Sequence, residues 1–366
     1  MRGMTNLIAR HMSGIAAVLV PPGAARYGAM LAVALTVMAQ PAVAQDQSAA
    51  EQPPESQTEE AATQEPQADD AQSGEAASTA PDAAAGSPAD ATARAFGAFQ
   101  RGYYLTAMEL ALPRAQLGDP AAQTLVAELF ASGLGVSRSM DDAAFWYQQA
   151  AEGGDASAQF KYGVMLIEGE YVAPDRQKAE ALMKKAADAG NAFAQFNHAQ
   201  ILVAAKPGTA GVLEALPYFE NAAEQGVSDA QYALAQIYAN TAGVADEKRA
   251  LARQYMEKAA RAGFDTAQLD YAIWLIDGIG GDKDYAAGFR WMQVAATRGN
   301  VVAQNRMAVL HINAIGTLGD PVEAAKWYIL SRRAGYDDRS LDDFYQGLTE
   351  DEQKRAIEAA NQFGKR

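Results

Sequence analysis

Apolar residues recur along most of this chain at the spacing of an amphipathic α-helix. In residues 122–130 they lie three or four positions apart, on one helix face, and residues 143–151 carry a second stripe of the same kind. Gly133 and Gly135 interrupt the chain between the two stripes. The pattern therefore predicts two helices joined by a turn, which we call helix A and helix B.

The helix pair is repeated along the chain at an almost constant interval. Each repeat opens with a glycine that is followed within a few residues by Ala-Gln, and these glycines are 36 or 37 residues apart. They are Gly118, Gly154, Gly190, Gly226, Gly263 and Gly299, and Gly335 follows without the Ala-Gln pair. A period of this length is typical of stacked two-helix units. The sequence thus predicts an all-α fold, an α-solenoid of about seven antiparallel helix pairs over residues 94–335.

Equivalent positions of the repeats form two columns of small residues. In helix A the column is Ala127, Gly163, Ala199, Ala235, Ala272 and Ala308. In helix B it is Ala107, Ala143, Ala179, Ala215, Ala252, Gly288 and Ala324. Small side chains that face large ones, such as Trp146, let two helix backbones approach closely. We therefore expect these columns to be the contact lines between helices.

The first 93 residues differ in composition from the rest. Residues 1–44 contain three arginines, an apolar run and the small-residue site Ala42-Val43-Ala44, which are the features of a cleavable signal peptide. The apolar run is about a dozen residues long, too short for a bilayer span, so no integral membrane span is expected after signal removal. Residues 45–93 contain eleven acidic residues and no Lys, Arg or aromatic residue, which predicts a disordered acidic linker. An uncleaved N-terminal anchor is the alternative.

The last residues, 336–366, are expected to form C-terminal capping helices. Thr349 stands three residues before Glu352, the pattern of a capping box, and the helix that follows is expected to cover the core of the last repeat. Asp119-Pro120 and Asp320-Pro321 predict helix starts, because an N-cap carboxylate accepts from free N–H groups and proline fits the first helical position. Pro113 and Pro217 lie inside helix B patterns, where they are expected to kink or shorten the helix.

Few residues suit catalysis or metal binding. The chain has no cysteine, which excludes disulfides and thiolate ligands, and its net charge of −15 argues against nucleic acid as a partner. His198 and His311 occupy columns that otherwise hold large apolar residues, which favours a place in the core. No catalytic residue, metal or cofactor is predicted. The repeated glutamines are interpreted as structural: Gln123, Gln159, Gln195, Gln231, Gln268 and Gln304.

Three short motifs resemble those of a known family. WY at 146–147, AEGG at 151–154 and GDASAQ at 154–159 resemble Sel1-like repeats, which are relatives of tetratricopeptide repeats. The resemblance covers about residues 95–335. It implies a right-handed superhelix in which helix A lines the concave surface, and an adaptor that binds a protein partner and is not an enzyme.

Two segments at the ends of the array carry a narrower resemblance. AFGAFQRGYYLTAMELA at 95–111 and the tail that begins LDDF at 341 are similar to alphaproteobacterial periplasmic Sel1-repeat regulators of a sensor histidine kinase. This similarity implies an exported, periplasmic protein. It also implies that the partner is the outer domain of a membrane protein.

If helix A lines the concave surface, its apolar residues predict a groove for a partner. The predicted groove residues are Phe160, Val164, Phe196, Tyr232, Leu269 and Ile273. The alternative is that part of this strip is core between repeats. Two other functions stay open: a cell-wall-associated enzyme related to β-lactamases, and a glycan-binding protein that stacks peptidoglycan sugars on aromatic rings.

Overall fold

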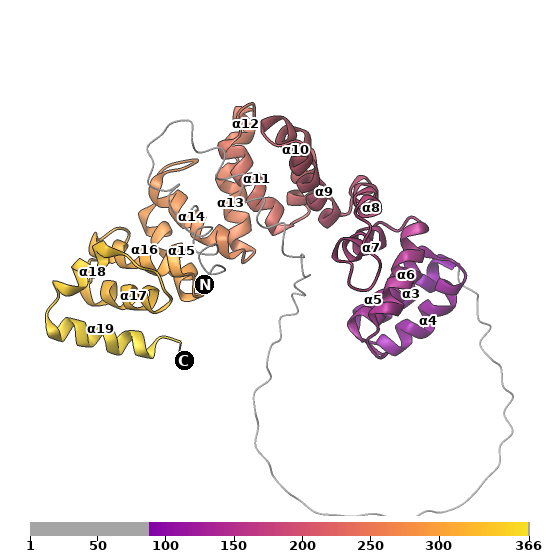
Figure 1. Cartoon of the computed structure of the whole chain (residues 1–366), viewed down its shortest axis with the longest axis horizontal. Coiled ribbons are helices and arrows are strands. Elements are labelled where there is room, and N and C mark those ends of the chain that lie inside the picture. Colours follow the sequence, from indigo (N-terminus) through magenta and orange to yellow (C-terminus); the bar gives the residue numbers. More distant parts are fainter. Residues whose placement is uncertain (1–87, 365–366) are drawn as a thin grey trace, which may run out of the picture.

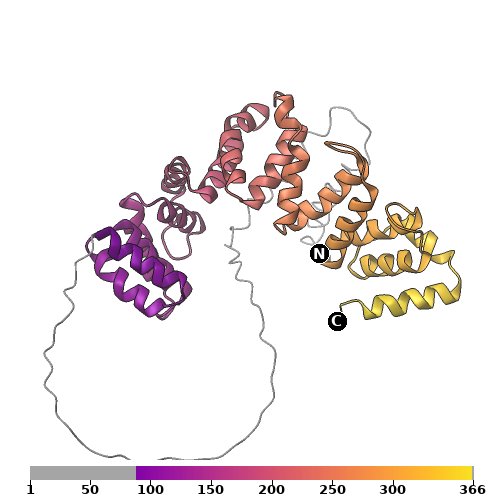
Figure 2. The ribbon, with the colours of Figure 1, turned by 180° about the vertical axis from the view of Figure 1, so that it is seen from behind.

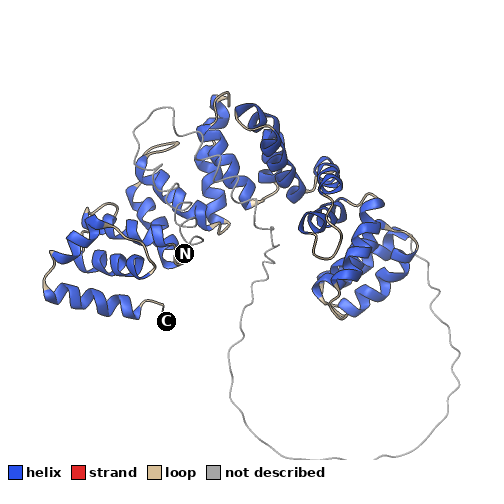
Figure 3. Cartoon of the chain, viewed as in Figure 1, coloured by secondary structure: helices blue, strands red, loops and turns tan. Residues whose placement is uncertain are grey.

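The computed structural model describes residues 88–364, which form a curved row of helix pairs (Figure 1). Figure 2 shows the same arc from behind, and Figure 3 shows only helices and loops in this part of the chain. The described residues confirm an all-α solenoid of stacked helix pairs. The predicted signal peptide at 1–44 and most of the predicted linker at 45–93 lie outside them.

The helices follow one another as pairs from one end of the arc to the other (Figure 1). The first four pairs are α3 (Pro88–Gln100) with α4 (Tyr104–Gln116), α5 (Pro120–Ser132) with α6 (Met140–Glu152), α7 (Ala156–Glu168) with α8 (Arg176–Asp188), and α9 (Ala192–Ala205) with α10 (Thr209–Glu224). The next three are α11 (Ser228–Asn240) with α13 (Ala252–Arg261), α14 (Asp265–Asp277) with α15 (Tyr285–Thr297), and α16 (Val301–Ile312) with α17 (Pro321–Arg333). A short helix, α12 (Asp246–Arg249), precedes α13, and α18 (Arg339–Gln346) and α19 (Glu350–Gln362) end the array.

The array begins before the expected boundary at residue 94. Helix α3 starts at Pro88, so residues 88–93 are helical although their composition had assigned them to the linker. Ala95 and Ala98 are buried in the cluster that α3 forms with α4 and α5. The Thr92 hydroxyl donates to Asp119 Oδ2 at 2.7 Å, which ties the first turns of α3 to the start of α5. Packing against the next pair therefore outweighs the polar composition of this stretch.

Helix B ends at the repeated glycine in the same way in each unit. After α6, Gly154 N donates to Ala151 O at 3.2 Å, and Asp155 N donates to Ala150 O at 3.0 Å. Gly154 has a φ of 94°, a left-handed conformation that glycine adopts without strain. The other repeated glycines share it: Gly118 (86°), Gly190 (91°), Gly226 (92°), Gly263 (86°), Gly299 (96°) and Gly335 (86°). An added Cβ at Gly154 would meet nothing within 4 Å, so the backbone conformation selects the residue.

A glutamine side chain joins each helix A to the helix B before it. Gln159 Nε2 on α7 donates to Ala151 O on α6 at 3.3 Å, the carbonyl that also accepts from Gly154 N. The equivalent bonds are Gln123 to Ala115 (3.0 Å), Gln195 to Ala187 (3.3 Å), Gln231 to Ala223 (3.1 Å), Gln268 to Ala260 (3.2 Å) and Gln304 to Ala296 (3.1 Å). We call this contact the glutamine clamp. It confirms that the repeated glutamines are structural.

The ends of the helices follow the sequence signals closely. Asp119 Oδ1 accepts from Ala121 N and Ala122 N, and Asp320 Oδ1 accepts from Val322 N and Glu323 N. These contacts confirm the predicted helix starts.

The C-terminal tail covers the last repeat, as expected. Thr349 and Glu352 form the predicted capping box at the start of α19. That helix packs on α17, where Phe363 meets Trp327 edge-on with ring centroids 5.4 Å apart. The tail therefore buries apolar surface that the end of an open array would expose.

The two prolines do not shorten helix B, so that part of the expectation is wrong. Helix α4 keeps 13 residues with Pro113 in its last turn, and α10 extends to 16 residues with Pro217 inside it. Ala215 and Phe219 are buried on either side of Pro217. Their packing holds the helix together in spite of the backbone hydrogen bond that proline removes.

The small columns are the contact lines between helices. The alanines of both columns are fully buried, with at most 1% exposed surface. At Gly288 on α15 an added Cβ would lie 2.6 Å from Ile276 Cγ1 and 3.1 Å from Ala272 O, both on α14. At Gly163 on α7 the nearest atom would be Ala179 O at 3.4 Å, an ordinary contact. An added methyl group therefore fits at Gly163 but overlaps its neighbours at Gly288.

Replacing each of these glycines by alanine should have opposite effects on stability. Gly288→Ala is expected to destabilise the chain by about 1–3 kcal/mol, because the new methyl group overlaps Ile276. Gly163→Ala is expected to stabilise it by up to about 1 kcal/mol, because alanine has the higher helix propensity and fits the space. Urea unfolding followed by circular dichroism measures both. Equal shifts for the two variants would contradict the close α14–α15 contact.

Candidate protein-binding surface

Two of the predicted groove residues are buried in the core. Phe160 and Phe196 are only 7% and 8% exposed. The Phe160 ring on α7 stacks against Phe193 on α9 with centroids 6.0 Å apart, and Phe196 packs edge-on against Phe219 on α10 at 5.9 Å. The expectation that these two rings line an open groove is therefore wrong. Phe160 packs against the next helix A, and Phe196 packs against helix B of its own pair.

The other four predicted residues are half-buried. Val164 packs against the cluster that contains Phe160, and Leu269 and Ile273 pack against the cluster around α14 to α19. Tyr232 on α11 reaches the next helix A, where its hydroxyl donates to Asp270 Oδ2 at 2.9 Å. Whether any of them contacts a partner stays a prediction.

Four of the six predicted residues stand at the second position after the alanine of Ala-Gln, where the side chains are buried or half-buried. Val164 and Ile273 stand at the sixth position, and the third position is partly exposed in five of the six repeats. Those residues are Lys161, Asn197, Ala233, Asp270 and Arg306. One residue turns a helix by about 100°, so a single step exchanges a contact with the next repeat for solvent. Three positions of each repeat form one surface: one before, three after and six after the alanine of Ala-Gln. We call this surface the helix A face.

The sequence did contain a signal for the exposed side of helix A, namely the charged residues at the third position. Lys161, Asp270 and Arg306 share one column with Asn197, and such residues are rarely placed in a core. That column could have marked the solvent side of helix A. Phe193 carried no comparable signal, because phenylalanine in an apolar helix is typical of a core residue.

The helix A face has an apolar part around α7 and α9. Phe193 is 47% exposed and lies over the buried ring of Phe160, while Val164 lies one helical turn beyond Phe160 on α7. We call Phe193, Phe160 and Val164 the apolar patch. A half-exposed ring that rests on a buried one is held in place before any partner arrives, so little side-chain entropy is lost on binding.

The same face has a polar part where α11 meets α14. Asp270 Oδ2 accepts hydrogen bonds from the Tyr232 hydroxyl at 2.9 Å and from Gln236 Nε2 at 3.1 Å. Burial raises the pKa of Asp270 to about 6, although these two hydrogen bonds and the charge of Arg306 oppose the rise. Burial and the neighbouring carboxylate together raise the pKa of Tyr232 above its ordinary range. The Tyr232 hydroxyl therefore stays protonated. It donates to Asp270 and holds the carboxylate in one orientation.

The two histidines lie in the core, as their columns predicted. His198 packs edge-on against Tyr218 with centroids 4.8 Å apart, and His311 packs against Phe289 at 5.3 Å. Burial lowers the pKa of both imidazoles. Among residues 88–364, no group of His, Asp or Glu side chains is arranged to hold a metal ion.

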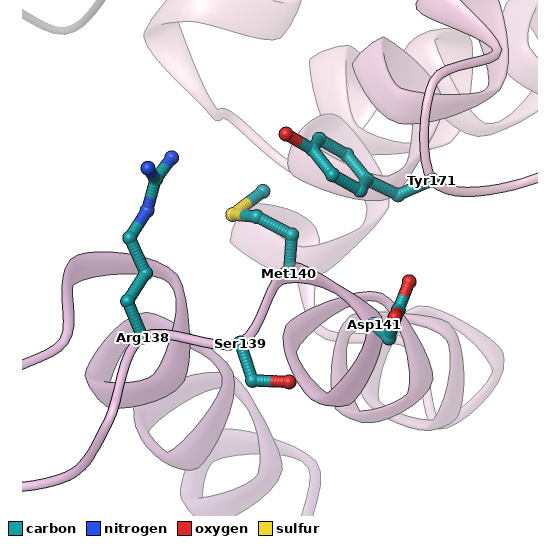
Figure 4. A pocket seen from close by; sticks show the side chains of 5 residues that line it. All are labelled: Arg138, Ser139, Met140, Asp141 and Tyr171. Atoms are coloured by element: carbon teal, nitrogen blue, oxygen red, sulfur yellow. The ribbon is translucent and has the colours of Figure 1, made fainter.

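An open surface pocket of about 340 Å³ lies where α6 begins, beside the turn between α7 and α8 (Figure 4). Figure 4 shows Tyr171 beside Met140, with the Arg138 guanidinium directed away from Asp141. Arg138 Nε donates to Ala131 O at 3.0 Å, so this arginine supports the turn between α5 and α6. The Ser139 hydroxyl oxygen in this lining accepts from Asp142 N at 3.3 Å, so this serine is the N-cap of α6.

The family comparison agrees with the geometry of the repeats. The family described as Sel1 repeat matches residues 120–155, 156–191, 228–264, 266–300 and 301–336. The chain therefore belongs to the Sel1 repeat family, whose arrays generally mediate protein–protein interaction and are generally not enzymes. Residues 192–227, which form α9 and α10, lie outside the matched segments. They keep the glutamine clamp through Gln195, so the structure identifies a further repeat there.

Two solved structures share the fold. One is a protective antigen with an SLR fold from uropathogenic Escherichia coli, which is 24% identical with a TM-score of 0.62 over 76% of this chain and 61% of that chain. The other is a Sel1 repeat protein from Oxalobacter formigenes, which is 25% identical with a TM-score of 0.55 over 68% of this chain and 99% of that chain. This chain thus spans about three fifths of the Escherichia coli antigen. Comparison with curated proteins gives no match.

None of the helices in residues 88–364 combines the length and the apolarity that a membrane crossing needs.

Replacing each of the two stacked phenylalanines by alanine should show which ring belongs to the core and which to the surface. Phe160→Ala is expected to cost about 3–5 kcal/mol of unfolding free energy, because it leaves a cavity between α7 and α9. Phe193→Ala is expected to cost about 1 kcal/mol, because half of the ring is already in water. Urea unfolding of the full chain measures both values. Similar losses for the two variants would show that Phe193 belongs to the core as well.

Proposed function

We propose that this protein is an exported scaffold or regulator that binds a protein partner through the helix A face. The observation that carries the proposal is the apolar patch, where Phe193 is half exposed although Phe160 beneath it is buried. Aromatic side chains on rigid elements are frequent anchors of protein interfaces. The family supports a protein partner, since Sel1-repeat arrays generally mediate protein–protein interaction.

Export and the partner's location rest on the sequence. Residues 1–44 have the pattern of a signal peptide, and residues 45–93 have the composition of a flexible acidic linker. The similarity of residues 95–111 to periplasmic Sel1-repeat regulators supports a partner in the same compartment. We therefore propose the outer domain of a membrane sensor kinase as that partner. Peptidoglycan sedimentation of the purified protein separates this proposal from glycan binding.

Crosslinking in intact cells tests the proposed surface. A photoreactive phenylalanine analogue replaces Phe193 on α9 or, as the matched control, Phe145 on helix α6, which is 54% exposed but belongs to a helix B. The Phe193 position is expected to give a crosslinked membrane protein, identified by mass spectrometry, and the Phe145 position is not. Equal products from both positions would contradict the helix A face as the binding surface.

A substitution complements the crosslink. Phe193→Ala is expected to weaken capture of the crosslinked protein about tenfold or more, since an anchor residue typically contributes about 2 kcal/mol. Phe145→Ala is expected to leave capture unchanged. Circular dichroism of both variants shows that the array is folded.

A further inference from the structure

We propose that Asp270 makes the helix A face selective for an extended partner segment that carries a lysine or arginine side chain. This inference rests on the proposed function and adds the chemistry of the partner. The geometry that carries it is a carboxylate with one oxygen held by two donors and the other without a hydrogen-bond partner among residues 88–364.

The two oxygens of Asp270 have different surroundings. Oδ2 accepts from Tyr232 and Gln236, at 2.9 Å and 3.1 Å. Oδ1 accepts no hydrogen bond from residues 88–364, and it is not among the buried polar atoms that lack a partner there. It therefore keeps some contact with solvent, although Asp270 as a whole is largely buried. A carboxylate whose orientation is set by two donors can accept a further charge-assisted hydrogen bond without reorganisation.

The charge of Asp270 is left unpaired by the neighbouring residues. Arg306 on α16 is near enough to influence Asp270, yet no ion pair within 4.0 Å joins them in the described part of the chain. Leu269 and Ile273, on the same helix, are half-buried apolar residues. Next to such low-polarity surface, a cation gains more from a carboxylate than it would in open water.

The other charges of this face are of both signs, since Arg306 on α16 is a cation that no ion pair within 4.0 Å joins to a described residue. Lys161 already pairs with Glu128 at 3.6 Å, so it offers no free cation. Asp229 lies one position before the alanine of Ala-Gln on α11. It adds a negative charge to the helix that carries Tyr232. The chain as a whole carries a net charge of −15, which also attracts basic segments over longer distances.

The repeat geometry sets the spacing between the anchors. Phe193 lies on α9 and Asp270 on α14, with one helix A, α11, between them. Packed helices lie about 8–10 Å apart, so the two sites are roughly 20 Å apart. An extended chain covers about 3.3–3.6 Å per residue, so about six residues separate the two anchors on the partner. The partner segment therefore combines a large apolar residue with a Lys or Arg about six positions away.

Selection from a displayed library of random twelve-residue peptides tests the inference on the full chain. Peptides selected by the wild type are expected to be enriched in Lys or Arg, about six positions from an aromatic or large aliphatic residue. Asp270→Asn keeps an acceptor for Tyr232 and removes the charge, so it should lose the basic enrichment and keep the apolar one. Asp277→Asn removes the same charge from an exposed position of α14 and should behave as the wild type.

Affinity measurements on one selected peptide test the contact with Asp270 quantitatively. Replacing its arginine by citrulline, or its lysine by norleucine, is expected to weaken binding to the wild type about tenfold. The same peptide change should have little effect on binding to Asp270→Asn. Equal losses for both proteins would overturn the role of Asp270.

Binding should also depend on pH in a defined direction. A cationic side chain binds the ionised carboxylate, and the pKa of Asp270 is about 6 in the free protein. The titratable and charged groups that face Asp270 are Tyr232 from α11 and Arg306 from α16. The pKa of Tyr232 is raised by burial, so its hydroxyl stays protonated between pH 5 and 7. Affinity is therefore expected to fall as the pH is lowered from 7 to 5 in the wild type but not in Asp270→Asn.

The outcomes separate this inference from the proposed function. Selected peptides that depend on Phe193 but show no basic residue would overturn the role of Asp270 and leave the binding surface intact. Failure to select any peptide, or selection of peptides that bind Phe193→Ala and Asp270→Asn as well as the wild type, would overturn both. Circular dichroism of each variant confirms that the helices are retained.

Discussion

The arrangement of the whole array depends on the glutamine clamp. The last carbonyls of an α-helix have no partner within the helix, and here the carbonyl of an alanine near the end of helix B accepts two donors. In the α6–α7 junction, Ala151 O receives Gly154 N from the turn and Gln159 Nε2 from the next helix. The turn ends one helix and the amide positions the following one. Because the contact recurs in six junctions, each pair is set against its neighbour in the same way.

This repeated junction determines which side of helix A can meet a partner. With each helix A held by its clamp, the second position after the alanine of Ala-Gln is buried or half-buried, and the third is partly exposed in five of the six repeats. Phe160 and Asp270 illustrate the two positions: the ring packs against the next helix A, and the carboxylate keeps one oxygen without a hydrogen-bond partner among residues 88–364. The half-exposed Phe193 and the oriented Asp270 thus arise from the same register.

Much of the fold could be predicted from sequence because the same local sequence signals recur in successive repeats. The glycine period, the small columns, the N-cap aspartates and the Thr349–Glu352 capping box each identify one local contact. The surface was harder to predict, since one residue changes the direction of a side chain by about 100° and both neighbouring columns contain large residues. The start of α3 and the intact helix around Pro217 depend on packing against neighbouring pairs, which composition and local propensity do not contain.

Hydrogen exchange across one junction tests the glutamine clamp most directly. Gln304→Leu removes the amide that binds Ala296 O, at 3.1 Å, while Gln293→Leu changes an exposed glutamine on α15 as a control. If the clamp couples the pairs, the first variant should lower the opening free energy of α15 and α16 by about 1 kcal/mol, giving roughly fivefold faster exchange there. Helices far from the junction should be unaffected. Exchange in α15 and α16 that matches the wild type would contradict the account.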